Sequence, residues 1–305
     1  MKEGIVMRST GSWYWIRTMD GEVIKCRLRG KFKLINKKIT NPIAVGDRAL
    51  LEYTDTRDWV IKKILDRSNY VIRESPRKRG HHHLIAANID QAMLIASLRQ
   101  PKTSLGFIDR FLVTLEAFRI PGIIVINKTD LYSEAELEAL ELTAALYDHI
   151  GYPTIFTAFY EGDIGPLSDY LGGKTTLLSG HSGTGKSTLV NLLIEDVHQK
   201  TMEVSGFADK GVHTTTFAEM FELDDGGFII DTPGIKELGL AEIEHSELSH
   251  YFPEMRKYIG QCRFNNCMHT GEPGCAVMEA LEAGEIPESR FQSYLSMLEN
   301  DDNRR

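Results

Sequence analysis

The 305-residue sequence contains no apolar run approaching the length of a membrane span, and its first residues show no signal-peptide core. It has only four cysteines, three of them clustered near the C-terminal end. A disulfide framework is therefore not expected, and the reducing cytoplasm is the predicted location. With no membrane partner and 42% hydrophobic residues, the chain is expected to form two or three globular domains.

Positive charge is scarce in most of the chain and concentrated at one end. The net charge is −8, but residues 1–80 contain 19 basic and 9 acidic residues, whereas the remainder contains 16 and 34. A basic segment attached to an acidic body indicates that the basic segment contacts a polyanion. The negative total therefore does not exclude a nucleic-acid partner.

Residues 1–72 predict a small β-barrel. Five short segments are rich in β-branched and aromatic residues and roughly alternate in polarity: residues 4–9, 12–18, 22–28, 48–53 and 59–65. Asp20-Gly21 is a hairpin-turn signal between the second segment and the third. This density of short strands suggests an OB-fold.

Aromatic and basic residues occur together in this predicted barrel. Trp13, Tyr14 and Trp15 lie one strand before a basic group that comprises Arg27, Arg29, Lys31, Lys33, Lys37 and Lys38. Cations combined with stacking aromatics are typical of an RNA-binding OB surface. The alternative is that at least one aromatic belongs to the core and that the charges form a solvated face.

Residues 73–83 predict a linker, because charged residues, Pro76 and Gly80 dominate this stretch. Its three consecutive histidines, His81 to His83, invite a metal-binding interpretation. Three adjacent side chains in a loop rarely share one metal ion, so we favour a connector and assign these histidines no role.

Residues 84–241 change to alternating apolar and helical segments. Buried strands are predicted at residues 91–98, 122–127, 153–158, 175–180 and 227–234. A helix that Ser133 and Glu136 cap is predicted between two of these strands. The alternation predicts a mostly parallel sheet with helices on both faces. Residues 242–305 predict a helical domain with a cysteine–histidine interruption.

The sequence GHSGTGKST follows one predicted strand and opens a helical pattern. It fits the phosphate loop G-x-x-x-x-G-K-[ST]. Its glycines let backbone N–H groups surround phosphate oxygens, Lys186 is expected to reach the β and γ phosphates, and Ser187 is expected to bind Mg²⁺. The predicted contact residues are Gly180, His181, Ser182, Gly183, Thr184, Gly185, Lys186, Ser187 and Thr188.

Two further motifs complete the phosphate side of the site. Asp231, in the sequence DTPG at the end of an apolar strand, is expected to hold Mg²⁺, and Gly234 is expected to sense the γ-phosphate. The sequence GVHTTT, residues 211–216, lies where a switch loop is expected. The pattern does not decide which of its threonines coordinates Mg²⁺, and Thr215 is our candidate.

Base selection is predicted at the sequence NKTD, which ends an apolar strand and comprises Asn127, Lys128, Thr129 and Asp130. The Asp130 carboxylate would accept hydrogen bonds from guanine N1 and N2, which adenine cannot offer. Asn127 would read O6 and steady the loop, and the Lys128 stem would stack on the base. Thr157 and Ala158 would supply a backbone contact to O6.

These motifs occur in the order 4-5-1-2-3 of a GTPase, with the base-reading loop before the phosphate loop. Either one motif is a chance match or the chain is circularly permuted. All of these loops lie at the carboxyl ends of parallel strands, so cyclic reordering leaves the site intact. We therefore predict a permuted P-loop GTPase that binds GTP and GDP with Mg²⁺.

One catalytic element is missing. Ile235 occupies the position after D-x-x-G where many GTPases have a water-orienting Gln, so slow intrinsic hydrolysis is expected. His213 is the candidate water-positioning residue, and the alternative is a structural histidine. The expected catalytic set is Lys186, His213, Asp231 and Gly234.

Four late residues, Cys262, Cys267, His269 and Cys275, form the pattern C-x4-C-x-H-x5-C. Three thiolates and one imidazole make a closed tetrahedral set that favours one structural Zn²⁺ with no open position for catalysis. The alternative is four unrelated residues in a loop that is rich in Gly and Pro. Cys26 lies on a predicted strand and is expected in the core.

Together these features resemble the ribosome small-subunit-dependent GTPase family (RsgA, also called YjeQ or YloQ). The resemblance is carried by NKTD, GHSGTGKST, GVHTTT, DTPG, the cysteine–histidine pattern and the basic barrel. It implies an N-terminal OB-fold, a permuted GTPase domain and a C-terminal zinc domain. It also implies late maturation of the small ribosomal subunit, contact with that subunit and its rRNA, hydrolysis stimulated by the subunit, and a monomeric cytoplasmic protein.

Two other functions stay open on the residues alone. The chain could be an RNA-binding module or tRNA-directed factor that uses GTP as a clamp, which stimulation specifically by small subunits would argue against. It could also be a P-loop kinase or ATPase, and Asp130 argues against that reading because it selects guanine.

Overall fold

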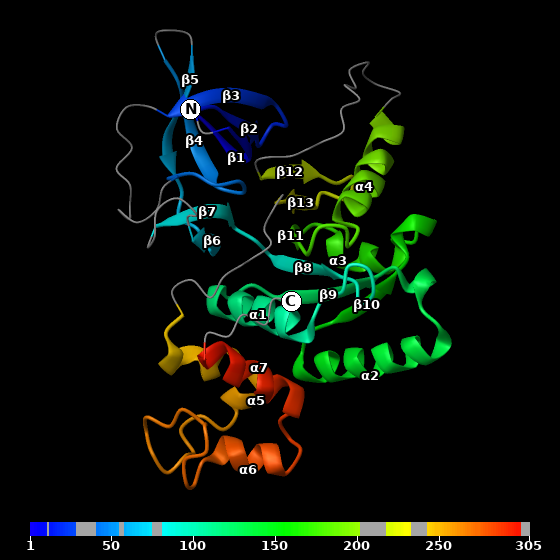
Figure 1. The fold of residues 1–305 in the computed structure, drawn as a ribbon. Coiled ribbons are helices and arrows are strands. Elements are labelled where there is room, and N and C mark those ends of the chain that lie inside the picture. Colours follow the sequence, from blue (N-terminus) through cyan, green and yellow to red (C-terminus); the bar gives the residue numbers. More distant parts are fainter. Residues whose placement is uncertain are drawn as a thin grey trace.

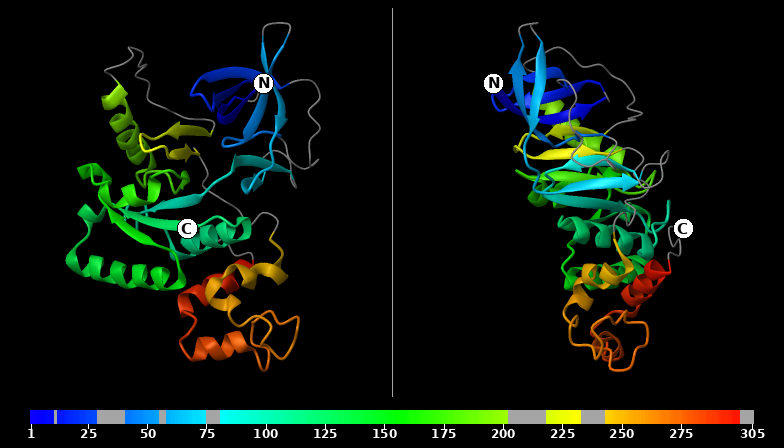
Figure 2. Two further views of the ribbon diagram at one scale, coloured as in Figure 1. Left: turned by 180° about the vertical axis from the view of Figure 1, so that it is seen from behind. Right: turned by 90° about the vertical axis from the view of Figure 1, so that its left-hand side faces the viewer.

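A computed structural model describes residues 1–10, 12–28, 41–54, 58–74, 81–201, 218–232 and 243–299. The chain forms three units stacked along one direction, with the N-terminal barrel and the C-terminal helices at opposite ends of a central α/β unit (Figure 1). Figure 2 shows the same order from behind and from the side. Across these ranges, no helix combines the length and the apolar character that crossing a membrane requires.

The N-terminal unit is a closed five-stranded barrel, which confirms the predicted architecture. Its strands are β1 (Lys2–Ser9), β2 (Tyr14–Thr18), β3 (Val23–Leu28), β4 (Arg48–Tyr53) and β5 (Trp59–Ile64). They pair in the order β1-β2-β3-β5-β4, and β4 returns to β1, so the ring closes. Alternate side chains point inward, and Cys26 lies in this core as predicted. Tyr14 lies there too, which agrees with the alternative that at least one of the aromatics belongs to the core.

A two-stranded hairpin that the sequence analysis missed follows the barrel. It consists of β6 (Tyr70–Glu74) and β7 (His82–Ala87), with Arg73 opposite His83. The ends of the predicted linker at residues 73–83 are therefore strand residues rather than irregular chain. Their charged and histidine-rich composition hides the alternation, while Val71 and Ala86 are buried in the core of the central unit. The exact domain boundaries stay predictions.

The central unit contains a six-stranded sheet in the order β10-β9-β8-β11-β13-β12. The strands are β8 (Gln91–Ala96), β9 (Gly122–Asn127), β10 (Thr154–Thr157), β11 (Thr175–Ser179), β12 (Glu219–Glu222) and β13 (Phe228–Asp231). Five are parallel and β12 is antiparallel to β13. The mostly parallel sheet that the sequence predicts is confirmed, with β12 as the strand it missed.

Helices cover both faces of this sheet. Helices α1 (Leu105–Phe118) and α2 (Glu134–Ile150) pack on one face, and α3 (Ser168–Leu171) and α4 (Lys186–Thr201) pack on the other. Short 3-10 turns are η1 (Thr129–Leu131), η2 (Phe159–Glu161) and η3 (Gly165–Leu167). The predicted cap of α2 is present, because the Ser133 N–H donates to the Glu136 carboxylate at 2.8 Å.

The C-terminal unit contains η4 (His245–Tyr251), α5 (Pro253–Arg256), α6 (Ala276–Glu282) and α7 (Glu288–Leu298). Its core includes Phe252, Met255 and Tyr294, and Val113 of α1 packs into the same cluster. Because a residue of the central unit contributes to this core, the C-terminal unit is docked on α1 by apolar burial.

A buried charge network fixes the same docking surface. The Arg290 guanidinium of α7 donates to Asp109 of α1 and to Glu254 of α5, each at 2.6 Å, and its side chain is only 1% exposed. Ser293 and Tyr147 also donate to the Asp109 carboxylate. Such a group joins distant parts of the chain in one geometry, because a buried carboxylate without its partners is costly.

Replacement of Arg290 by Leu should leave Asp109 and Glu254 as unpaired buried carboxylates. We expect the C-terminal unit to lose about 3–5 kcal/mol of stability, measured as faster amide hydrogen exchange along α7. Arg256→Gln is the matched control, because its ion pair with Glu116 joins the same two units but is half exposed, and its loss should cost below about 1 kcal/mol. Equal losses in the two variants would contradict the expectation.

Candidate nucleotide and zinc sites

The predicted nucleotide motifs meet at one edge of the sheet. The phosphate loop follows β11, Asp231 ends β13, the NKTD sequence follows β9, and Thr157 ends β10. Neighbouring parallel strands present their carboxyl ends on the same side, so segments far apart in sequence become adjacent. The permuted order therefore produces a single candidate site.

The phosphate loop requires glycine at defined points. Gly180 and Gly185 have φ values of 142° and 109°, which favour glycine. A Cβ at Gly180 would lie 2.2 Å from the carbonyl oxygen of Ile95, and one at Gly185 would lie 2.2 Å from Asn127 Nδ2. The loop is therefore packed tightly against β8 and the base-reading loop.

Lys186 and Asp231 face one another across a half-buried site. The Lys186 ammonium donates to the carbonyl oxygens of Gly180 and His181, the latter at 2.7 Å. Burial lowers the pKa of Lys186 and raises the pKa of Asp231, and in each case the charge of the other residue opposes the shift. Phosphate oxygens and a divalent cation would supply the charges that both groups favour.

Asn127 joins three loops of the site. Its side chain is buried, Nδ2 donates to the Thr184 carbonyl at 2.8 Å, and Oδ1 accepts from the Phe159 N–H at 3.0 Å and from the Thr157 hydroxyl at 3.4 Å. Of the two roles predicted for Asn127, this geometry supports steadying the loops. The reading of guanine O6 stays a prediction, because the amide nitrogen carries two hydrogens and the bond to Thr184 uses one of them, and the sequence did not predict the Phe159 contact.

The remaining NKTD residues adopt a compact turn. Lys128 has a left-handed backbone with φ 70°, and its ammonium donates to the Gln100 carbonyl. The Thr129 hydroxyl donates to the Thr157 carbonyl at 3.1 Å and so ties the two base loops together. Asp130 is exposed beside this turn, where its carboxylate can accept hydrogen bonds from a ligand.

A loop that the sequence analysis missed connects these elements. Residues 97–104, here called the bridging loop, lead from β8 into α1. Tyr132, which follows NKTD, accepts the Leu98 N–H at 2.8 Å, and Pro101 lies beside Gly183 of the phosphate loop. The signal that could have revealed it is its position, because any polar loop at the carboxyl end of a central parallel strand borders the site.

The remaining residues that were predicted to contact the nucleotide differ in their exposure. Ser182, Ser187 and Thr188 are exposed at the phosphate loop and the first turn of α4, whereas Thr184 is fully buried. The His181 ring lies 4.0 Å from the ring of Phe107 on α1. Ala158 is buried directly after β10. Outside the described residues lie Gly211, His213, Thr214, Thr215, Thr216, Gly234 and Ile235.

The predicted zinc ligands converge in the C-terminal unit. The ligand atoms of Cys262, Cys267, His269 and Cys275 all lie within 4.8 Å of one another. The sulfur atoms of Cys262 and Cys275 are 3.9 Å apart and His269 Nδ1 is 3.3 Å from Cys275 Sγ, close to the edges of a tetrahedron with Zn–S bonds of about 2.3 Å. The donor set therefore fits one structural Zn²⁺.

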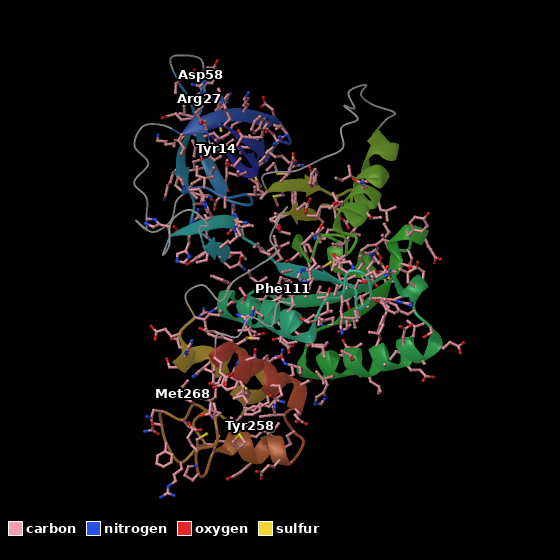
Figure 3. The ribbon with its side chains drawn as sticks, viewed as in Figure 1. Tyr14, Arg27, Asp58, Phe111, Tyr258 and Met268 are labelled. Carbon is pink, nitrogen blue, oxygen red and sulfur yellow. The ribbon has the colours of Figure 1, made fainter. Side chains whose placement is uncertain are left out.

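Residues beside the ligands hold this loop in place. The Glu272 carboxylate accepts the N–H groups of Met268 and Thr270, each at 2.7 Å. The Tyr294 hydroxyl of α7 donates to the Met268 carbonyl at 2.6 Å (Figure 3 labels Met268). His269, which has φ 58°, is thereby fixed between two anchored neighbours. The sequence pattern alone does not reveal these supporting contacts.

Comparisons with known proteins cover nearly the whole chain. The sequence model of the RsgA N-terminal domain matches residues 3–61, and that of the RsgA GTPase matches residues 64–241. The chain is 48% identical to the small ribosomal subunit biogenesis GTPase RsgA 2 of Bacteroides thetaiotaomicron, over 98% of this chain and 96% of the relative. It is 50% identical to the RsgA of Cytophaga hutchinsonii, over 99% and 100%.

Solved structures show the same architecture. The crystal structure of YjeQ from Thermotoga maritima superposes with a TM-score of 0.79 at 37% identity and covers 100% of this chain and 99% of that one. The structure of YloQ, described as a circularly permuted GTPase, gives a TM-score of 0.74 at 30% identity, with coverage of 100% and 96%. The three-unit arrangement and the permuted motif order are therefore shared with experimentally determined folds.

Replacement of Asp130 by Asn should weaken GTP binding at least about tenfold and shift the preference toward xanthosine triphosphate. The reason is that an amide cannot accept both hydrogen bonds from guanine N1 and N2. Competition binding with the two nucleotides measures the preference. Asp169→Asn, an exposed acid on α3, is the control and should bind like the wild type. Unchanged GTP selectivity in the Asp130 variant would refute the base-reading role.

Replacement of Cys275 by Ser should reduce bound zinc well below one ion per chain, because a neutral hydroxyl replaces a thiolate ligand. Metal analysis of the purified protein measures this, and amide exchange in α6 should accelerate. Cys26→Ala is the matched control, since Cys26 lies in the barrel core, and it should retain full zinc content. A Cys275 variant with undiminished zinc would exclude this residue as a ligand.

Proposed function

The chain belongs to the RsgA GTPase family, and on this premise we propose that it hydrolyses GTP to GDP and phosphate during late maturation of the small (30S) ribosomal subunit. Family membership makes it a GTPase. The observation that carries the proposal is the junction at Asn127, which holds the phosphate loop and both base loops in one site despite their permuted order. The relatives are named as small ribosomal subunit biogenesis GTPases, and this supplies the ribosomal context.

Hydrolysis would follow from the geometry of the phosphate side. Backbone N–H groups of the phosphate loop and the Lys186 ammonium bind the β and γ phosphates, and Ser187 and Asp231 hold Mg²⁺. When bound, Mg²⁺ neutralises charge that develops on the phosphate oxygens. Asp130 selects guanine, while Asn127 keeps the two halves of the site in register. His213, Thr215 and Gly234 keep their predicted roles in this scheme, as water-positioning, metal-binding and γ-phosphate-sensing residues.

The barrel is the proposed RNA-facing unit. Trp13, Trp15, Lys25 and Arg27, here called the aromatic–basic stripe, lie on its outer face. Arg27 lies 3.8 Å and Lys25 4.5 Å from the centroid of the Trp13 ring, and Lys25 also lies 5.3 Å from the Trp15 ring. Figure 3 labels Arg27 on this unit. Partly exposed rings between cations can stack bases while the cations contact phosphates.

The domain organisation that accompanies this function is proposed as predicted. Residues 1–72 form the RNA-binding barrel, 73–83 the connection, 84–241 the GTPase domain and 242–305 the zinc domain. Support comes from the three hydrophobic clusters that are centred on the barrel, the central sheet and the C-terminal unit. We propose a cytoplasmic monomer whose partner is the small subunit and its rRNA.

The test is GTP turnover by the purified protein alone, with small subunits, with large subunits and with free RNA. We expect slow turnover alone and at least a tenfold increase with small subunits only, because a docked partner would order the catalytic groups. Lys186→Ala, which removes the phosphate-binding ammonium, serves as the control for contaminating activity and should abolish turnover. Equal turnover under all four conditions would favour an RNA-binding clamp instead.

A further inference from the structure

The barrel and the GTPase sheet share a strand joint. Strand β1 of the barrel pairs antiparallel with β12 of the sheet, with Arg8 directly opposite Glu219. Figure 1 shows β12 between the barrel strand β1 and β13 of the central sheet. The joint makes one continuous ladder from the RNA-facing unit into the nucleotide-binding unit.

Four functionally placed residues follow one another across this ladder. Trp15 of β2 is opposite Arg8 of β1, Arg8 is opposite Glu219 of β12, and Glu219 is opposite Asp231 of β13. Directly opposed residues point to the same face of a sheet. The row therefore leads from the aromatic–basic stripe to the carboxylate that we place at the Mg²⁺ site.

Arg8 is the branch point of this row. Its guanidinium lies 5.3 Å from the Trp15 ring centroid, and Nη1 lies 3.5 Å from Glu219 Oε1. The Arg8 side chain is 46% exposed, whereas that of Glu219 is 18% exposed. Arg8 is thus accessible to an RNA phosphate beside the stripe, while Glu219 is largely enclosed at the joint.

The negative charges in this row make it important whether Arg8 pairs with Glu219 or with an RNA phosphate. Glu219 and Asp231 are like charges on directly opposed positions, an arrangement that is unfavourable unless a cation compensates it. Lys186 faces Asp231 from the phosphate loop, and Arg8 pairs with Glu219 from the barrel side. A phosphate competes well for arginine, because its oxygens match the guanidinium fork. Withdrawal of Arg8 would therefore leave the Glu219 carboxylate uncompensated at the position directly opposite Asp231 in the sheet.

We propose that Arg8 is a positioning residue that couples RNA binding to Mg²⁺ binding. An RNA phosphate at the stripe draws Arg8 away from Glu219, and the uncompensated Glu219 carboxylate strengthens the attraction of the Asp231 side of the site for Mg²⁺. The inference rests on the proposed function, in which Asp231 holds Mg²⁺ and the barrel meets RNA. It assigns the response to one ion pair at the joint between the two units.

The chain offers a matched control at the same joint. Arg17 of β2 and Glu222 of β12 form a second ion pair between the barrel and the sheet, at 2.5 Å. Glu222 is opposite Phe228 rather than Asp231. Glu222 lies three residues from Glu219 on β12 and is therefore outside the row. Loss of this pair weakens the joint without changing the charge in the row.

The experiment measures the Mg²⁺ concentration needed for half-maximal binding of a fluorescent GTP analogue, with and without a short single-stranded oligoadenylate. In the wild type we expect the RNA to lower this concentration about fivefold, the low end of typical coupling between sites. Arg8→Gln should show the lowered concentration even without RNA. Glu219→Gln should show no response to RNA, whereas Glu222→Gln should respond like the wild type.

The outcomes distinguish a failure of the proposed GTPase function from a failure of the coupling through Arg8. A wild-type protein that fails to bind the analogue would overturn the proposed function itself. Normal analogue binding with no RNA-dependent shift would overturn the coupling alone. Equal loss of the response in Glu219→Gln and Glu222→Gln would show that the joint is merely structural, which also overturns the assignment to Arg8. Oligoadenylate binding, followed by anisotropy, confirms that each variant still engages RNA.

Discussion

Parallel pairing of the central strands is the constraint on which the rest of the structure depends. It brings the carboxyl ends of β8, β9, β10, β11 and β13 to one edge of the sheet, whatever their order along the chain. The side chain of Asn127 then converts proximity into a fixed arrangement, because its three hydrogen bonds tie the phosphate loop to both base loops. A permuted chain can therefore build the same site as an unpermuted one.

The two outer units are attached to this site by different physical means. The C-terminal unit is held on α1 by a shared apolar core and the buried Arg290 network. Such an attachment is rigid, because any partial separation exposes unpaired buried charges. The barrel is joined to the sheet edge by strand pairing and by partly exposed ion pairs, which solvent and polyanions can reach, while Val45 and Val71 pack into the core of the central unit. The rigid joint suits fixed positioning, and the accessible joint suits a response to RNA.

The bridging loop and α1 connect the rigid joint with the nucleotide site. The loop touches the NKTD turn through Lys128 and Tyr132 and lies beside the phosphate loop at Pro101. It continues into the helix that carries Asp109, the partner of Arg290. The zinc unit is thus connected to both halves of the site by one short, packed path, in addition to the covalent connection through the strand that ends at Asp231.

The sequence by itself determined the chemistry of this protein. Gly180, Gly185 and Lys186 at their spacing predict phosphate binding, and the cysteine–histidine pattern predicts zinc, because these functions depend on local residue types at short range. Strand alternation and caps also predicted the barrel, the parallel sheet and the start of α2. The hairpin of β6 and β7 escaped prediction, because charged residues and histidines mask its alternation and its buried face is defined only by distant partners.

Tertiary structure decided how the predicted parts are joined. It showed that Asn127 bonds to Thr184 and Phe159, and it revealed the bridging loop and the contacts of Glu272 around the zinc ligands. It also aligned Arg8, Glu219 and Asp231 in one row and placed Arg290 between two carboxylates. These contacts link residues up to 211 positions apart along the sequence, and no local pattern encodes such pairs, because strand register and domain docking arise only when the whole chain folds.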